Sequence, residues 1–181
     1  MTDSDPLSTL LADDALADIG TRPIGDLRSF RYQAGQVESD VSLVRRVAQG
    51  RLDIIGHEVQ RRTGSSDVAV LDDLLYDLPE ILTDPSEAKA ARSGRAVEIN
   101  DPGITAANLG TRLDSVISPG ELSGVGDLSD ERLDQSFVKV SDMEQELSDI
   151  RRQLHDRIDA VQQEIGRRYR DGEASIESFG R

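Results

Sequence analysis

Residues 38–53 read ESDVSLVRRVAQGRLD, and residues 144–159 read EQELSDIRRQLHDRID. The two stretches have the same spacing of Glu, Ser, Arg and Asp, and they lie 106 positions apart. At this offset, residues 37–62 align with residues 143–168 without a gap, and nine aligned positions are identical. The chain therefore contains an internal repeat.

Apolar residues in both copies recur every three or four positions, which is the spacing of one face of an amphipathic helix. These apolar stripes consist of Val37, Val41, Val44, Ala48, Leu52, Ile55 and Val59 in the first copy, and of Leu133, Phe137, Val140, Met143, Leu147, Ile150, Leu154, Ile158, Val161 and Ile165 in the second. The pattern predicts two long helices over about residues 36–63 and 129–171, with Ser129 as the N-cap of the second.

The remaining segments predict a simple domain organisation. We expect a mostly flexible acidic arm over residues 1–35, a short helix over 67–82, a flexible linker over 85–127 and a tail over 173–181. Residues 36–172 then form one domain. The predicted fold is all-α, an antiparallel coiled-coil hairpin built from the two duplicated long helices.

Composition restricts the possible functions. Only 36% of the 181 residues are apolar and 3% are aromatic, which suits an elongated helical protein better than a fold with a wide core. The formal net charge of −14 makes direct binding to DNA phosphates unfavourable. No apolar run is long enough for a membrane span and the first residues do not resemble a signal peptide, so we expect a cytoplasmic protein.

In each copy, five polar residues each come directly after a residue of the apolar stripe. We call each set a polar ridge. The ridges consist of Glu38, Ser42, Arg45, Gln49 and Asp53 in the first copy, and of Glu144, Ser148, Arg151, His155 and Asp159 in the second. Helical geometry keeps each ridge within an arc of about 80° over about 22 Å. Antiparallel pairing through the stripes would place both ridges on one shared face, whereas parallel pairing would place them on opposite faces.

The ridge residues suit a guanine nucleotide. The planar fork of Arg matches the O6/N7 edge of guanine or a phosphate, and a carboxylate accepts hydrogen bonds from the N1 and N2 groups of guanine. Ser and Gln supply neutral hydrogen bonds to phosphate or ribose. From chemistry alone, a solvated helix face explains such a ridge as well.

The two stretches resemble the RsiG family of actinobacterial anti-sigma factors, whose signature is a duplicated E-x3-S-x2-R-x3-Q-x3-D motif on two antiparallel helices. Residues 38–53 match all five defining positions, and residues 144–159 match four, because His155 replaces Gln. The resemblance covers both predicted long helices.

The resemblance implies a developmental regulator that binds cyclic di-GMP as a pair of molecules and thereby holds a WhiG-type sporulation sigma factor inactive. Carried over by position, the motif arginines and aspartates would contact guanines, and the serines and Gln49 would contact phosphate or sugar. The resemblance assigns no role to Glu38 or Glu144. It implies no cofactor besides this ligand.

Two other functions fit the same pattern: a coiled-coil scaffold that binds no nucleotide, and a cyclic di-GMP receptor for some other protein. An enzyme is disfavoured because His57 and His155 are the only histidines and lack a nucleophilic partner constellation. Without cysteine, and with one histidine on each long helix, we also expect no metal site.

Overall fold

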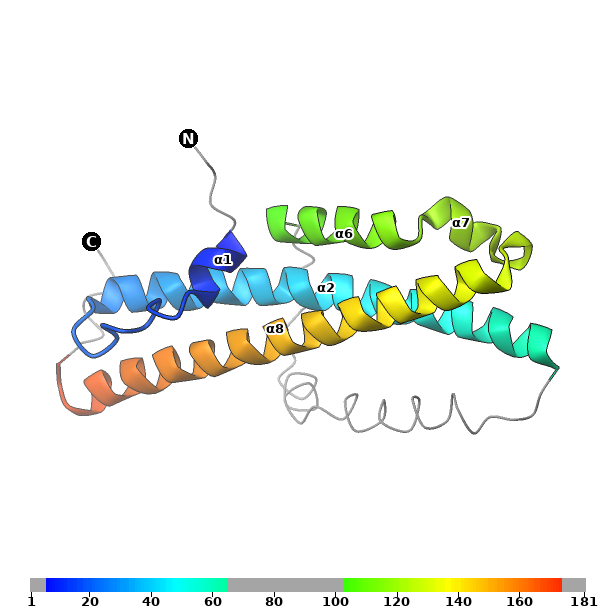
Figure 1. Ribbon diagram of the computed structural model, residues 1–181. Coiled ribbons are helices and arrows are strands. Elements are labelled where there is room, and N and C mark those ends of the chain that lie inside the picture. The colour runs from blue at the N-terminus through cyan, green and yellow to red at the C-terminus, as the bar shows by residue number, and fades with distance from the viewer. Residues whose placement is uncertain (1–5, 65–102, 174–181) are drawn as a thin grey trace, which may run out of the picture.

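A computed structural model describes residues 6–64 and 103–173 of the chain. In chain order the elements are α1 (Pro6–Leu11), α2 (Ile24–Thr63), α6 (Ile104–Val116), α7 (Pro119–Ser123), the 3-10 helix η1 (Val125–Asp127) and α8 (Asp130–Arg170). The described residues form no strands, so the predicted all-α class is confirmed. Figure 1 shows α2 and α8 side by side along the length of the molecule.

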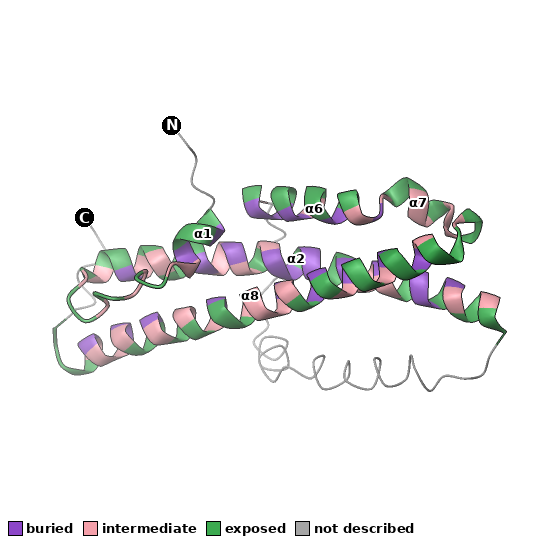
Figure 2. Ribbon diagram, viewed as in Figure 1, coloured by how far each residue is buried: buried purple, intermediate pink, exposed green. Residues whose placement is uncertain are grey.

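The helices α2 and α8 run antiparallel, which confirms the predicted hairpin. Arg28 near the start of α2 donates a hydrogen bond to Tyr169 near the end of α8. At the opposite end, Arg62 donates to Asp130 in the first turn of α8 at 2.7 Å. Most members of the two predicted apolar stripes are buried and the others are partly buried within the same core. Figure 2 shows this buried side of each helix facing its neighbours.

The ends of the long helices follow from local sequence. Gly64 ends α2 with a φ of 58°, a left-handed conformation that glycine adopts without steric cost. Ser129 caps α8, because its side chain accepts a hydrogen bond from the N–H of Arg132. Acidic residues in the first turn of α8 and basic residues in its last turn complement the helix dipole.

The first long helix begins earlier than the sequence pattern predicted. The expectation of a flexible arm up to residue 35 is wrong for residues 6–35, which include α1 and the first third of α2. Leu27 is fully buried against Val161 and Ile165 of α8. The apolar stripe continues upstream through Leu27, Phe30 and Ala34, and this burial extends α2 across Gly25 and Gly35.

The expected linker over residues 85–127 is wrong for its second half. Residues 104–127 form α6, α7 and η1, and α6 packs on α2 through Thr105, Ala106, Leu109 and Leu113. Gly103, Pro119 and Gly124 of this segment stand at helix ends, with Pro119 at the start of α7. The predicted short helix over 67–82 and the rest of the linker lie outside the described residues, as do residues 174–181 of the tail.

The duplication extends further than the predicted alignment. The long helices begin at Ile24 and Asp130, which are again 106 positions apart. At the same offset Leu7 and Leu113 are both buried, one in α1 and the other in α6. Each copy therefore consists of a short helix, a connecting segment and a long helix, and the two copies pack around a pseudo-two-fold axis.

Within the described ranges, no helix is both long enough and apolar enough to cross a membrane.

Candidate functional site

The first ridge glutamate joins the two long helices. Glu38 Oε1 accepts a hydrogen bond from Ser42 Oγ at 2.7 Å on its own helix. It also accepts one from Arg151 Nε of α8 at 3.0 Å and lies 3.2 Å from His155 Nε2. We call these four residues the Glu38 cluster.

The second ridge glutamate makes the equivalent contacts in the opposite direction. Glu144 Oε1 accepts hydrogen bonds from Ser148 Oγ at 3.2 Å, from Arg45 Nη1 at 3.2 Å and from Gln49 Nε2 at 3.0 Å. We call these four residues the Glu144 cluster. Each contact in one cluster has its counterpart in the other at an offset of 106 positions, so the two ridges share one face, as antiparallel pairing predicted.

The pseudo-two-fold axis passes between the two clusters. The two cross-helix ion pairs are Arg45–Glu144 and Arg151–Glu38. The point midway between their residues lies next to Ser42 on α2 and next to Ser148 on α8. The two arginines lie three residues beyond these midpoints, which at 1.5 Å per residue separates them by about 9 Å along the hairpin. The ridge thus presents a symmetric pair of guanidinium groups near its centre.

The central ion pairs are largely shielded from water. The side chains of Arg45 and Glu144 are 7% and 11% exposed, and those of Arg151 and Glu38 are 13% and 19% exposed. Removing one partner from such a pair leaves a charge without its counter-ion in a poorly solvated place, which costs several kcal/mol. The pairs therefore hold the arginine side chains in defined positions.

The ionisation of Glu38 reflects its cluster. Burial opposes its charged form, but the hydrogen bonds from His155, Ser42 and Arg151 outweigh burial and lower the pKa of this carboxyl to about 2. Glu38 is consequently an anion throughout the neutral pH range, and it supplies the negative partner for the opposite helix's arginine.

The two ridge aspartates lie outside the clusters. Asp53 and Asp159 are exposed, each eight positions after the arginine of its own copy, or about 12 Å along the helix. Because each aspartate lies beyond its arginine on its own side of the axis, the two aspartates are about 33 Å apart along the hairpin. Each half of the ridge thus contains a central, shielded guanidinium and an outer, solvent-exposed carboxylate.

A second set of duplicated arginines binds the short helices, and their role was not apparent from the sequence. Arg51 Nη1 donates to Leu113 O at 3.1 Å and to Ile117 O at 2.6 Å at the end of α6, and Nη2 pairs with Asp114. Its counterpart Arg157 donates to the carbonyls of Leu11 and Ala12 at the end of α1. These positions were identical in the repeat, but only the packing of α1 and α6 reveals what they bind.

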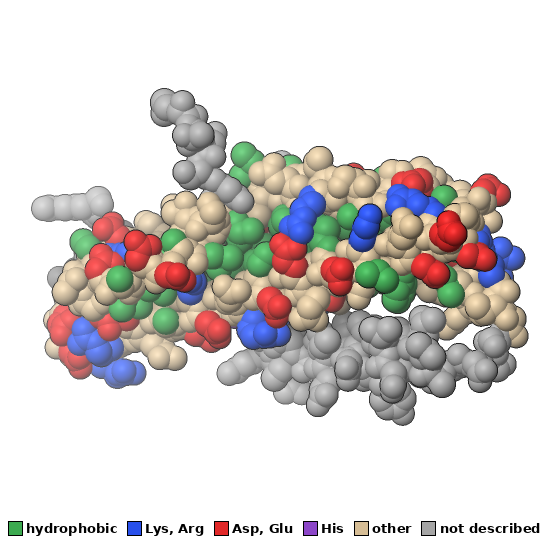
Figure 3. Space-filling view, viewed as in Figure 1, with side chains coloured by type: hydrophobic (Ala, Val, Ile, Leu, Met, Phe, Trp, Pro, Cys, Tyr) green, Lys and Arg blue, Asp and Glu red, His purple; other side chains and the backbone are tan. Residues whose placement is uncertain are grey.

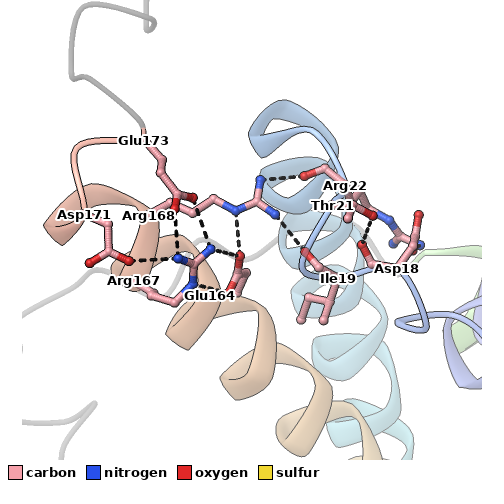
Figure 4. Close-up of polar contacts among 9 residues, drawn as sticks. All are labelled: Asp18, Ile19, Thr21, Arg22, Glu164, Arg167, Arg168, Asp171 and Glu173. Atoms are coloured by element: carbon pink, nitrogen blue, oxygen red, sulfur yellow. Dashed lines mark hydrogen bonds and ion pairs between the residues drawn. The ribbon is translucent and has the colours of Figure 1, made fainter.

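The last turns of the long helices carry a further duplicated cluster. Glu164 accepts hydrogen bonds from Arg167 and Arg168, and Arg168 also donates to the carbonyls of Ile19 and Arg22 (Figure 4). In the first copy, Glu58 accepts hydrogen bonds from Arg61 and Arg62, and Arg62 also donates to the carbonyl of Val125. Both clusters fix the segment that precedes the other copy's long helix.

Charge is mixed on the face of the molecule that Figure 3 shows. On the face drawn in Figure 3, the described acidic and basic side chains are interspersed, with apolar side chains between them. An extended basic patch, which binding to DNA phosphates requires, is not seen among the described residues of this face.

Comparison with known proteins identifies a related family. A family model described as RsiG-like matches residues 13–82 and 119–180, which together make up more than half of the chain. Both ridges lie within the matched ranges. Among curated proteins, no sequence matches the chain significantly.

Proposed function

The chain belongs to the RsiG-like family of anti-sigma factors, and on this basis we propose that it binds cyclic di-GMP across the two ridges and then sequesters a WhiG-type sigma factor. The ligand, the type of sigma factor and the site residues are all part of this proposal. We propose a binding protein and not an enzyme.

The observation that carries the proposal is the crossed arrangement of the two clusters. A duplicated motif on separate faces could serve two independent purposes, but here Arg45 and Arg151 lie close to one axis on one face. Two identical cyclic dinucleotides related by this axis would meet the same groups on both sides of it. The guanidinium groups and outer carboxylates are also the groups that recognise the two edges of guanine.

The length of the ridge favours two ligand molecules. The distance of about 33 Å between Asp53 and Asp159 exceeds the span of one cyclic dinucleotide, whereas two molecules, one on each side of the axis, could reach both carboxylates. A ligand that contacts both the ridge and the sigma factor stabilises their complex more than either free protein, which makes sequestration dependent on the nucleotide.

The experiment is isothermal titration of cyclic di-GMP into the full chain, alone and with a WhiG-type sigma factor. The variants are Arg45→Ala and Asp159→Ala, and the matched control is Arg46→Ala, whose side chain is exposed next to Arg45. We expect binding that the sigma factor strengthens, that both ridge variants lose and that the control retains.

Equal sigma affinity with and without nucleotide would contradict nucleotide-dependent sequestration. If no mixture released or absorbed heat and a competition assay also detected no binding, the nucleotide would be excluded. The chain would then act as a coiled-coil interaction module that uses another surface.

A further inference from the structure

The ridge glutamates are the motif residues to which guanine chemistry assigns no role. In each glutamate, Oε1 accepts a hydrogen bond from the serine of its own copy and another from the arginine of the other copy. Each glutamate therefore links the serine of its own copy to the arginine of the other copy.

The cross-helix ion pair between Arg45 and Glu144 supports a positioning role for the glutamate. Arg45 uses Nη1 for Glu144, while its Nε is buried and has no hydrogen-bond partner within the described part of the chain. The pair with Glu144 fixes the rotamer of Arg45, and because Nε is buried, a ligand would reach this guanidinium through its Nη groups. A guanidinium held in advance loses less conformational entropy when a ligand binds.

We propose that Glu38 and Glu144 are positioning residues that act in trans, each orienting the nucleotide-binding arginine of the opposite helix. Glu144 orients Arg45, and Glu38 orients Arg151. This inference rests on the proposed function, and it adds that neither copy of the motif is a complete half-site without the glutamate of the other copy.

A crossed pattern of coupling distinguishes positioning from direct contact with the ligand. We combine Glu144→Gln with Arg45→Lys, the arginine that it contacts, and separately with Arg151→Lys, which lies on its own helix. The full chain is titrated with cyclic di-GMP, and helix content and unfolding are recorded for each variant. Glu146→Gln is the control, because Glu146 pairs at the surface with Arg112.

We expect Glu144→Gln to weaken nucleotide binding at least about fivefold and Glu144→Ala to weaken it further, because glutamine keeps an acceptor for the guanidinium. With Arg45→Lys the two losses should not multiply, since both variants disturb the same pair. With Arg151→Lys they should multiply. The control should bind like the wild type.

Losses that multiply in both combinations would overturn positioning and would indicate that the glutamate contacts the nucleotide directly. Equal coupling to both arginines would also overturn it, in favour of a general effect of charge. If the wild type bound the nucleotide but the crossed pattern were absent, only this inference would fail. A wild type that does not bind would remove both this inference and the proposed function.

Discussion

Replacing Arg51 by alanine should release the end of α6 from the hairpin. The guanidinium, in a side chain that is 9% exposed, donates to the carbonyls of Leu113 and Ile117 and pairs with Asp114. Both carbonyls belong to fully buried residues. The substitution therefore removes charged hydrogen bonds at a place where water cannot easily replace them.

The magnitude follows from these partners. A hydrogen bond to a charged donor contributes about 1.5–3 kcal/mol. The contact with Ile117 counts in full, whereas that with Leu113 counts for less because this carbonyl also accepts from the N–H of Ile117. Asp114 is half exposed, so its ion pair adds at most about 1 kcal/mol. We expect a loss of about 3 kcal/mol, or roughly 6–12 °C in Tm.

The assay is chemical and thermal unfolding followed by circular dichroism, with hydrogen exchange of the α6 amides as a local readout. Arg152→Ala is the matched control, because this side chain is 69% exposed and pairs only with Asp149 among the described residues. The control should change stability by less than about 0.5 kcal/mol. If Arg51→Ala lost no more than the control, or if α6 exchange did not increase, the anchoring role would be refuted.

Three further predictions concern single interactions. The pKa of Glu38 is about 2, against an ordinary 4.5, so the stabilising contribution of its carboxylate is present above pH 4.5 and lost as the pH falls toward 2. The difference in unfolding free energy between the wild type and Glu38→Gln, measured in urea, should therefore shrink from pH 4.5 to pH 2. A difference that stays constant over this range would contradict the prediction. The Asp40 carboxylate accepts hydrogen bonds from the N–H groups of Gly103 and Ala106 at the start of α6, and a Cβ at Gly103 would clash with it. Gly103→Ala and Asp40→Ala should therefore each cost about 1 kcal/mol and the double variant little more. Additive losses would show that the two substitutions do not disturb the same cap. Asp53→Asn and Asp159→Asn change exposed side chains, so each should keep Tm within about 2 °C of the wild type. Each should nevertheless weaken cyclic di-GMP binding at least about tenfold. A large fall in Tm would indicate that the aspartate has a structural role instead.

The sequence predicted those parts of the fold that depend on periodicity within one helix. The two apolar stripes and the N-cap Ser129 follow from local spacing and helix chemistry, whereas spacing alone left antiparallel and parallel pairing of the long helices open. The shared face of the two ridges followed as well, because the offset of one position between stripe and ridge is the same in both copies.

The parts that the sequence did not predict depend on contacts between segments far apart in the chain. Residues 104–116 contain no long apolar stripe, and their helix is stabilised by Asp40 at its beginning and Arg51 at its end, both from α2. The glutamates presented the same difficulty, because their partners lie on the other long helix. Matched positions in the repeat marked these residues without identifying what they bind.

The exchange of contacts between the copies also restricts how the two halves of the chain can diverge. Glu38 contacts Arg151 and not its own copy's Arg45, and the carbonyls that Arg51 binds lie at the end of the other copy's short helix α6. A substitution that breaks one of these contacts would therefore have to be compensated in the other half, at a position that is not its aligned equivalent. The two halves can differ in sequence, as Gln49 and His155 do at matched positions, provided that each half keeps the contacts that hold the other in place.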